Sequence, residues 1–312
     1  MIEIIKYTPE FKPTWNDFVE SSKNGTFLFN RDYMDYHADR FKDNSFLIFR
    51  KGKLYCLLPA NINDSTLFSH QGLTYGGLIM SEKCSAEGVL EVFNFLLELL
   101  KESGISKFIY KSIPHIYHKL PSEEDLYALF RNNASLISRN ISSTIPLPSP
   151  LRLKKDRREA VRRAINNNIS VAESSYFETF WEILEENLKF TYGAKPVHSL
   201  KEMRNLVASF PQNIKLIAAY NGEKIVAGLV AYFSGTTIHA QYISANPEGK
   251  KTGAVDLIIH TLIEKYQNSL FEWLDLGTSN EDGGKYLNES LIYQKEGFGG
   301  RGICYDTYEI KL

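Results

Sequence analysis

Apolar and polar positions along the chain switch between strand-like and helix-like patterns, first in residues 45–113. Residues 45–70 show three short, largely apolar segments separated by the turns KGK and NDS, which predicts three strands. Residues 85–104 carry apolar side chains at helical spacing and end at Gly104, which predicts a long amphipathic helix. Residues 106–113 then predict one more strand.

The second half of the chain repeats this order. Residues 214–245 predict three strands joined by the turns NGE and SGT, residues 253–267 a long helix, and residues 271–277 a strand. Helical patterns precede the strands in both halves. The sequence therefore predicts an α/β (α+β) protein that uses one fold twice, each copy a mixed, mostly antiparallel sheet flanked by helices.

A proline-rich segment separates the two halves. Pro146, Pro148 and Pro150 restrict the backbone to extended conformations. A strongly charged segment that predicts a helix follows at residues 151–167. We place the junction there and expect domains at residues 1–149 and 150–312, since a chain of 312 residues has room for two domains of ordinary size.

The composition is that of an ordinary globular protein. The hydrophobic share is 43%, the charged share is 23% and the formal net charge is -1, which argues against a surface built wholly for nucleic acid. The N-terminus lacks the apolar core of a signal peptide, and polar side chains interrupt the longest apolar run, residues 89–100. We expect a cytoplasmic protein without a membrane span.

Three cysteines, Cys56, Cys84 and Cys304, are far apart in the sequence. They form no CxxC or Cys/His spacing, so the sequence predicts neither a disulfide framework nor a metal site. Unpaired cysteines fit a reducing compartment.

Four segments carry a resemblance to a known family: NGTFLFNRDYM, SHQGLTYGGLI, LKKDRREAVRRAINNNISV and LDLGTSNEDGGKYLNESLIYQKEGFGG. In the last of these, a strand, a D-x-G turn, a helix and the pattern L-x-x-x-K-x-x-F-G follow one another. Together with the repeated order of elements, they make the chain resemble the GNAT N-acyltransferases. Two tandem GNAT-like units are similar to the Fem-like branch, which includes the peptidoglycan bridge aminoacyltransferases. The resemblance covers nearly the whole chain and implies an acyltransferase.

The GNAT resemblance also implies acyl-CoA as co-substrate. Ordinary members hold its pyrophosphate on a Q/R-x-x-G-x-G/A loop at the start of the long helix, and the matching stretch here, NPEGKKTGAVD, lacks the full pattern. Either backbone N–H groups and two lysines hold the phosphates, or the stretch is a solvated turn capped by Thr252. The implied binding residues are Gly249, Lys250, Lys251, Thr252 and Gly253.

The predicted strand at residues 237–244 carries polar side chains in mid-sheet. Strict alternation puts Thr237, His239, Gln241 and Ile243 on one face. A histidine suits the removal of a proton from an amine that attacks a carbonyl. His239 is therefore a candidate catalytic base and Gln241 a candidate substrate contact. The alternative is a hydrogen-bonded histidine on a solvated face.

The strand at residues 271–277 ends in a polar, glycine-rich loop, and binding sites of sheet proteins collect at such ends. Asp275 either fixes a substrate or caps the next turn. Lys295 is a candidate catalytic cation that stabilises an oxyanion or holds phosphate, or it is a lysine favoured by a helix C-terminus. Further candidates for substrate binding are Asn280, Tyr286 and Asn288.

A glycine-rich segment in the first half, SHQGLTYGG, raises the same question. Its glycines either let the backbone approach a ligand, with His70 and Tyr75 lining an interdomain cleft, or form a structural turn. For Arg31, a structural ion pair is the favoured interpretation over a ligand contact.

The predicted helix at residues 151–167 carries seven Lys and Arg residues against Asp156 and Glu159. This excess suits phosphate groups of a nucleotide-linked or lipid-linked acceptor, or of an aminoacyl-tRNA donor. Some Fem enzymes use a long coiled-coil arm for aminoacyl-tRNA, and this sequence has no such segment.

The leading hypothesis is an N-acyltransferase that moves an acyl or aminoacyl group onto an amine of a phosphate-bearing small molecule or cell-envelope precursor. The alternative is a non-catalytic ligand-binding protein of degenerate GNAT fold. A third possibility is an RNA-binding protein, against which the near-neutral net charge and the lack of aromatic residues among the arginines argue.

Overall fold

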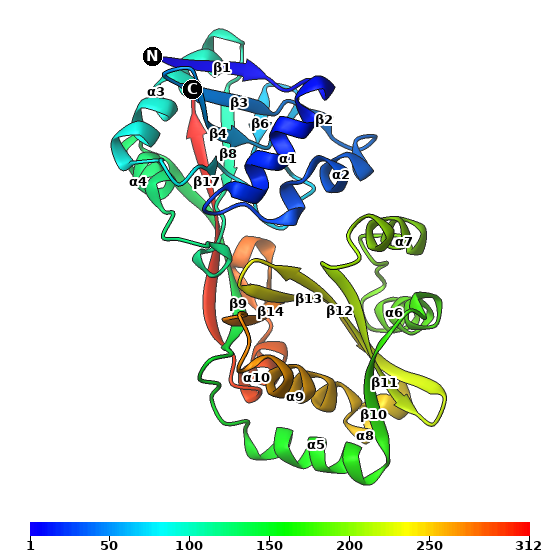
Figure 1. Cartoon of the computed structure of the whole chain (residues 1–312). Coiled ribbons are helices and arrows are strands. Elements are labelled where there is room, and N and C mark those ends of the chain that lie inside the picture. The colour runs from blue at the N-terminus through cyan, green and yellow to red at the C-terminus, as the bar shows by residue number, and fades with distance from the viewer. The chain divides into compact units, whose positions relative to one another are not determined.

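The computed structural model describes residues 1–312 except for the side chains of residues 191 and 192. The chain divides into two compact units, here called unit 1 and unit 2. Each unit is built from sheet strands and flanking helices (Figure 1). Unit 1 comprises Met1–Asn140, Asn280–Tyr286 and Cys304–Leu312, and unit 2 comprises Ile141–Ser279 and Leu287–Ile303.

Unit 1 contains a purely antiparallel sheet of order β1-β3-β4-β7. In its other sheet, β17 pairs antiparallel with β8, β8 runs parallel to β6, and β5 and β2 follow antiparallel. The elements of unit 1 are β1 (Ile2–Lys6), α1 (Lys12–Ser21), α2 (Arg31–Met34), β2 (Lys42–Asp43), β3 (Phe46–Arg50), β4 (Lys53–Leu58), β5 (Asn61–Asn63), β6 (Thr66–Phe68), β7 (Ile79–Met80), α3 (Ala86–Glu102), β8 (Lys107–Lys111), α4 (Glu124–Arg131) and β15 (Asn280–Glu281). Three strands have residues in both units: β9 (Ser135–Pro146), β16 (Tyr286–Leu287) and β17 (Arg301–Lys311).

Helix α3 is the long helix predicted at residues 85–104. The side chain of Ser85 accepts a backbone hydrogen bond at its start, and Gly104 adopts φ = 76° just beyond its end. Val92, Phe93 and Leu96 on its apolar face are fully buried in the core of unit 1. Each such burial stabilises the fold by about 1.5–3 kcal/mol, so this helix anchors the unit.

Unit 2 is built on a mixed sheet in which the strands follow in the order β10-β11-β12-β13-β14-β9. Neighbouring strands are antiparallel except for β13 and β14, which run parallel. The remaining elements are α5 (Lys155–Asn166), β10 (Ile169–Ser174), α6 (Phe177–Tyr192), α7 (Leu200–Ser209), β11 (Ile214–Asn221), β12 (Lys224–Ser234), β13 (Thr237–Ala245), α8 (Pro247–Thr252), α9 (Ala254–Tyr266), β14 (Trp273–Thr278) and α10 (Glu289–Gly297).

Helices cover both faces of the unit 2 sheet. Apolar side chains of α9 and α5 share one core with those of β11, β12 and β13. On the other face, the ring of Phe180 in α6 packs onto Gly228, where a Cβ would lie 2.4 Å from the ring. Gly228 is thus required for close approach of α6, and the predicted α/β class with sheets flanked by helices is confirmed.

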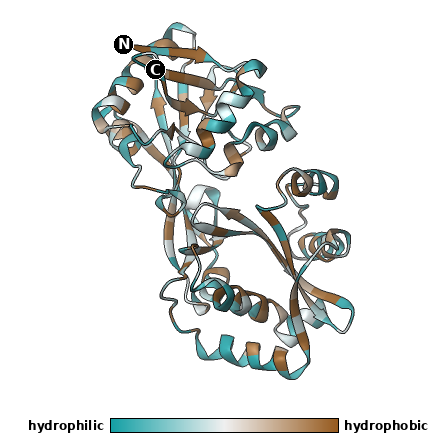
Figure 2. Ribbon diagram, in the orientation of Figure 1, coloured by the Kyte–Doolittle hydropathy of each residue, from teal (hydrophilic) through white to brown (hydrophobic). Residues whose placement is uncertain are grey.

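The distribution of apolar and polar residues agrees with this packing of helices on the sheet. Figure 2 shows apolar residues along the strands of unit 2 and polar residues along much of α5. No helix in the described part of the chain combines the length and the apolar content needed to cross a membrane.

Strands β13 and β14 part soon after they pair. Their pairing covers only Thr237–His239 and Trp273–Asp275, whereas β14 stays beside β9 as far as Thr278. The polar side chains predicted to be functional in these strands therefore lie where the two strands separate.

The division into units differs from the single junction expected near residue 150. The first boundary falls inside β9, and residues 280–286 and 304–312 belong to unit 1. The reason is strand pairing, because β17 lies in register with β8, with Tyr308 opposite Tyr110. The end of the chain thereby completes a sheet of unit 1, a pairing between distant positions that local patterns do not reveal.

Candidate functional site

A buried carboxylate lies in β14, just before the end of the strand. Asp275 is fully buried and accepts hydrogen bonds from the hydroxyls of Ser142 and Thr144 in β9, the second at 3.3 Å. The backbone N–H of Gly277 donates to the same carboxylate at 3.0 Å. These donors compensate for the loss of water around a buried charge. Asp275 therefore does cap the following turn, one of the two roles expected for it.

His239 is a further partner of that carboxylate. Its Nδ1 lies 2.9 Å from Oδ2 of Asp275, and its side chain is 13% exposed. Donation of Nδ1–H to the carboxylate fixes the tautomer in which Nε2 carries the lone pair. A histidine oriented in this way is suited to accept a proton from a substrate.

A β-bulge in β13 changes the faces predicted for this strand. The pairing with β12 skips Gln241, which is the extra residue of the bulge. His239 and Tyr242 pair with Tyr232 and Val230, which are two residues apart and share a face. Strict alternation does not hold across a bulge, so Tyr242 lies on the face of His239, contrary to the prediction for that residue. The side chain of Gln241 hydrogen-bonds to that of Tyr242.

Lys295 of α10 is held at the same strand end. Its Nζ donates to the carbonyl oxygens of Gly277 and Thr278, both at 2.8 Å. Burial lowers the pKa of Lys295 to about 8, and the negative charge of Asp275 opposes that shift. The structure thus brings together three of the sequence-predicted residues, His239, Asp275 and Lys295, around the end of β14.

The stretch expected to be a phosphate loop is helical. Helix α8 begins after Asn246, whose side chain accepts the backbone N–H of Gly249 at 2.9 Å. The Nζ of Lys250 donates to Asn187 at 2.5 Å, and the hydroxyl of Thr252 donates to a backbone carbonyl one turn earlier at 2.9 Å. Neither an open loop nor a turn capped by Thr252 is formed.

Both glycines of this stretch are constrained by packing. A Cβ on Gly249 would lie 2.2 Å from the carbonyl oxygen of Val226, and one on Gly253 would lie 2.6 Å from that of Ala160 in α5. Gly253 also adopts φ = 84°. Helix α5 therefore covers the turn between α8 and α9, so these residues do not fit CoA phosphates in the manner of the usual GNAT loop. Lys251 is exposed.

An ion pair lies at the first turn of α9. The guanidinium of Arg157 in α5 is 3.0 Å from the carboxylate of Asp256. Burial raises the pKa of Asp256, against the opposing effect of Arg157. Both side chains line a cavity of about 420 Å³ that Arg163 and Lys250 also line. The anion-binding position of this helix start is therefore occupied by a carboxylate of the protein itself.

The other candidates beyond β14 lie apart from the hydrogen bonds around Asp275. Asn280 belongs to unit 1 and donates to Asn140 at 2.5 Å. Tyr286 is 60% exposed. The side chain of Asn288 accepts the backbone N–H of Leu291 at 3.1 Å and so caps α10. Asn288 thus has a structural role that accounts for its residue type.

The candidates of the first half are buried in unit 1. His70 has φ = 69° and stacks on His37 with ring centroids 5.1 Å apart, and burial lowers the pKa of His70 to about 3. Tyr75 donates its hydroxyl to Thr26 at 3.2 Å. Arg31 forms ion pairs with two aspartates, as expected. The burial of His70 and Tyr75 favours the structural interpretation of this segment.

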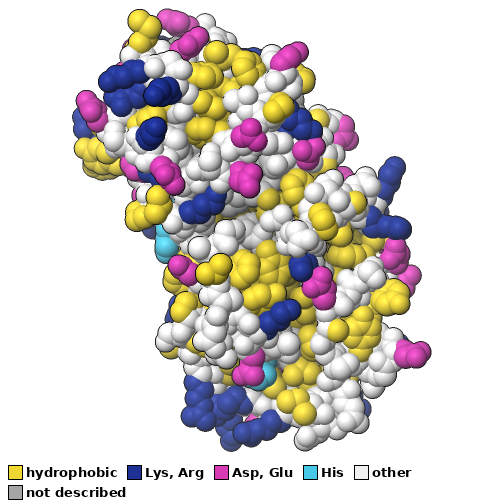
Figure 3. All heavy atoms as spheres, in the orientation of Figure 1, with side chains coloured by type: hydrophobic (Ala, Val, Ile, Leu, Met, Phe, Trp, Pro, Cys, Tyr) yellow, Lys and Arg dark blue, Asp and Glu magenta, His cyan; other side chains and the backbone are white. Residues whose placement is uncertain are grey.

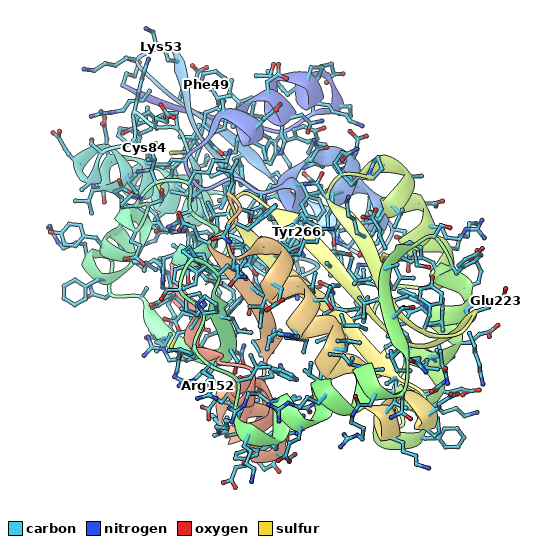
Figure 4. The ribbon with its side chains drawn as sticks, turned by 60° about the horizontal axis from the view of Figure 1, so that its bottom comes forward. Phe49, Lys53, Cys84, Arg152, Glu223 and Tyr266 are labelled. Carbon is cyan, nitrogen blue, oxygen red and sulfur yellow. The ribbon has the colours of Figure 1, made fainter. Side chains whose placement is uncertain are left out.

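Cations of the segment that leads into and forms α5 gather on its surface. Figure 3 shows a cluster of Lys and Arg side chains at the edge of unit 2 where α5 lies, and Figure 4 labels Arg152 near its start. Arg158 donates to the carbonyl oxygen of Leu153 at 2.5 Å and is partly buried. The exposed cations are Arg152, Lys154, Lys155, Arg162 and Arg163.

Two groups of polar residues near His239 and Asp275 are not predicted from the sequence. Ser142 and Thr144 are two of the hydrogen-bond donors to Asp275; their i, i+2 spacing marks one strand face, but nothing local links that face to β14. The hydroxyl of Tyr242 lies 2.7 Å from Nδ1 of His198, and the ring of Tyr242 packs edge-on against Trp181. This polar cluster shares the sheet face of His239. Among the described side chains, no group of three or more His, Cys, Asp or Glu residues is placed to hold a metal ion.

A mixed sheet whose parallel strands part, with a long helix between them in the chain, is the part of the fold that a known family shares. Residues 152–286 match the model of the family described as "Acetyltransferase (GNAT) domain". This match identifies a GNAT domain in that part of the chain. A comparison with curated proteins finds no match.

Several solved structures have a fold similar to that of the chain. FemX has a TM-score of 0.70 at 11% identity, with 99% of this chain and 97% of FemX covered. The C-terminal domain of a putative lysylphosphatidylglycerol synthetase from Agrobacterium fabrum has a TM-score of 0.62 at 10% identity, with 97% and 92% covered. A tandem GNAT protein from the clavulanic acid biosynthesis pathway has a TM-score of 0.51 at 10% identity, with 100% and 98% covered. At these identities the likeness shows the fold.

Proposed function

We propose that the protein transfers an acyl or aminoacyl group onto an amine of a phosphate-bearing acceptor, and that the reaction takes place at the end of β14 in unit 2. The observation that carries this proposal is the hydrogen bond between His239 and buried Asp275, with Lys295 bound to the carbonyl oxygens at the end of the same strand. A base and a cation at one strand end match the two needs of acyl transfer to nitrogen.

The base in this proposal is His239. The acceptor amine attacks the carbonyl carbon of the donor, the C–N bond forms, and Nε2 of His239 takes the proton that the nitrogen loses. The tetrahedral intermediate then collapses, the C–O or C–S bond to the donor breaks, and the imidazolium gives its proton to the leaving oxygen or sulfur. Asp275 is a positioning residue, since its carboxylate fixes the tautomer and stabilises the imidazolium that forms. Donors from β9 hold that carboxylate in place.

The cation is Lys295. An ammonium group has three N–H donors, and two of them bind the carbonyl oxygens of Gly277 and Thr278. The third is available for the oxygen that becomes negative in the tetrahedral intermediate. At neutral pH the group remains mostly protonated, because its pKa of about 8 lies above 7.

The donor class in this proposal is an acyl or aminoacyl ester or thioester that does not depend on the usual GNAT phosphate loop. The helical form of residues 247–252 and the cover by α5 support this. The putative synthetase among the similar structures is named for lysylphosphatidylglycerol, a product with an aminoacyl group on a phosphate-bearing acceptor. The exposed cations of α5 suit the phosphate groups of such an acceptor, or of an aminoacyl-tRNA.

The test is a transfer assay with two donors, acetyl-CoA and a mixture of aminoacyl-tRNAs carrying labelled amino acids. Acceptors are offered in parallel as nucleotide-linked amino sugars and as vesicles that contain phosphatidylethanolamine, a phospholipid with a free amine. We expect label to move from one donor to one acceptor, with loss of transfer in His239→Ala and in Lys295→Ala while the far-UV circular dichroism is retained. If no donor supports transfer, the proposal fails and a ligand-binding role for the same fold replaces it.

A further inference from the structure

Two thiols in unit 1 lie side by side, although they are distant in the sequence. Sγ of Cys56 in β4 is 3.5 Å from Sγ of Cys84, which lies between β7 and α3. Cys56 is fully buried, Cys84 is 7% exposed, and both are free thiols. Cys84 is labelled in Figure 4 among the elements of unit 1. Acyl transfer in unit 2 makes no use of either residue.

We propose that Cys56 and Cys84 form a reversible oxidation site, at which hydrogen peroxide converts the two thiols into a disulfide. The sulfurs have to approach from 3.5 Å to a bond length of about 2.05 Å. Cys56 is fixed in mid-sheet, since it pairs with Ile48 on one side and Met80 on the other. Cys84 lies outside the strands and helices, in the turn at residues 81–85. Cys84 is therefore the residue that moves when the two sulfurs approach each other.

The surroundings give the two thiols unequal reactivity. The hydrogen bond from Cys56 lowers the pKa of the Cys84 thiol, and Ser81 and Lys23 act in the same direction. Burial raises the pKa of the Cys56 thiol. Cys84 is therefore the group that ionises and attacks first, and Cys56 is the group that resolves the intermediate.

The reaction balances with hydrogen peroxide as the oxidant. The Cys84 thiolate attacks one peroxide oxygen, an S–O bond forms, the O–O bond breaks and hydroxide leaves. Cys56 sulfur then attacks the sulfur of this sulfenic acid, the S–S bond forms, and the S–O bond breaks. The hydroxyl of the Cys84 sulfenic acid combines with the proton of the Cys56 thiol and leaves as water. In total, two thiols lose two electrons and two protons, and the peroxide becomes two water molecules.

The test is peptide mapping of the whole protein after treatment with hydrogen peroxide, with alkylation of the remaining thiols and tryptic digestion without reductant. Cleavage after Lys53 and Lys83 places the two thiols on peptides 54–83 and 84–101, and Cys304 falls on peptide 302–311. We expect peptides 54–83 and 84–101 to be linked, with a mass lower by two hydrogen atoms than their sum. Dithiothreitol should separate them.

The exposed Cys304 provides the control. Cys304→Ser should form the same linked peptides, whereas Cys84→Ser should not form them. The proposal is overturned if peptide 84–101 gains oxygen without becoming linked, or if the only disulfide formed joins Cys304 residues of two chains.

A second measurement uses the wild-type protein alone, because substitution of the fully buried Cys56 alters a core position. A disulfide restricts the unfolded chain, so the thermal midpoint measured without reductant should rise by several degrees on oxidation and return with dithiothreitol. A midpoint that falls on oxidation means that the link forms only in a distorted fold, and overturns the proposal.

Discussion

His239 Nδ1 lies 2.9 Å from Asp275 Oδ2, and the two residues face each other in register on the parallel strands β13 and β14. The carboxylate is fully buried and is bonded by donors from β9 and from its own turn. A buried charge of this kind is poorly screened by water, so it acts strongly on the imidazole beside it.

Asp275→Asn tests whether this pair works as a proton-accepting unit. The amide places an N–H where the carboxylate accepted the Nδ1–H of His239, and the histidine then prefers the tautomer with the proton on Nε2. We expect the transfer rate to fall by about 10²–10⁴-fold, the range of general base catalysis. The measurement is steady-state transfer beside urea unfolding.

Thr144→Val is the matched control for this change. It removes a longer hydrogen bond of 3.3 Å to the same carboxylate without altering its charge. We expect a loss of about 0.5–1.5 kcal/mol in unfolding free energy and a rate within a few-fold of wild type. Equal rates in Asp275→Asn and wild type would remove the histidine–aspartate pair from the mechanism.

The pH dependence of transfer tests Lys295. Its pKa is lowered to about 8 by burial, so the ammonium loses its proton in the folded protein well before an exposed lysine does. The rate should fall above pH 8 as this charge disappears. Lys295→Arg keeps a cation at all accessible pH values, so it should retain a reduced rate that no longer declines there. If the rate of the arginine variant still falls above pH 8, that fall is due to a group other than Lys295.

Local patterns predicted the elements that form the site but not the contacts between them. The strands that carry His239 and Asp275 follow from apolar periodicity and turn residues, whereas the helix that carries Lys295 is expected from the family pattern alone. The partner strand β9 does not, because its pairing with β14 joins positions far apart in the sequence.

Two features of the fold also lay beyond sequence patterns for identifiable reasons. The bulge at Gln241 shifts the alternation of β13 by one residue, and no glycine or proline marks it. The return of residues 304–312 to unit 1 depends on pairing of β17 with β8. By contrast, the phosphate loop at residues 249–253 is expected from a family pattern. In the structure this segment is helical and packs against α5.

Burial of His70 should make the free energy of unfolding fall in acid. Burial, reinforced by the positive charges of His37, Arg31 and Lys111, lowers the pKa of His70 to about 3, whereas an unfolded histidine has a pKa of about 6.5. Between these values the unfolded state binds a proton that the folded state does not. The free energy of unfolding therefore falls by about 1.4 kcal/mol per pH unit as pH drops from about 6 toward 3.

His70→Asn removes this titration and suits the backbone, because asparagine tolerates the positive φ of this position. The overall stability should fall through lost packing, but the slope of unfolding free energy against pH should decrease by about one proton. Urea unfolding at pH 4, 5 and 6 measures it. A slope equal to that of wild type shows that His70 is not held neutral.

Gly253→Ala tests the packing of α5 on the turn between α8 and α9. The new Cβ would lie 2.6 Å from the carbonyl oxygen of Ala160, in addition to the strain of φ = 84°. The strain costs about 1–2 kcal/mol and the crowding about 1–3 kcal/mol more. Gly222→Ala is the control, since it has φ = 60° with nothing within 4 Å of the added atom and pays only for strain. Urea unfolding should place Gly253→Ala clearly below Gly222→Ala, and equal stabilities would mean that α5 does not press on this turn.

Thermal unfolding with acetyl-CoA and with free CoA tests the phosphate loop itself. A ligand at 100 times its dissociation constant stabilises the folded state by about 2.7 kcal/mol, which raises the midpoint by roughly 2–4 °C per kcal/mol. Because Asn246 already binds the N–H of Gly249 and Lys250 already binds Asn187, we expect no shift with either ligand. A shift of several degrees that disappears in Lys250→Ala would instead show that α8 opens to hold the pyrophosphate, and would restore CoA as the donor. A shift that survives this substitution would place CoA at some other part of the chain.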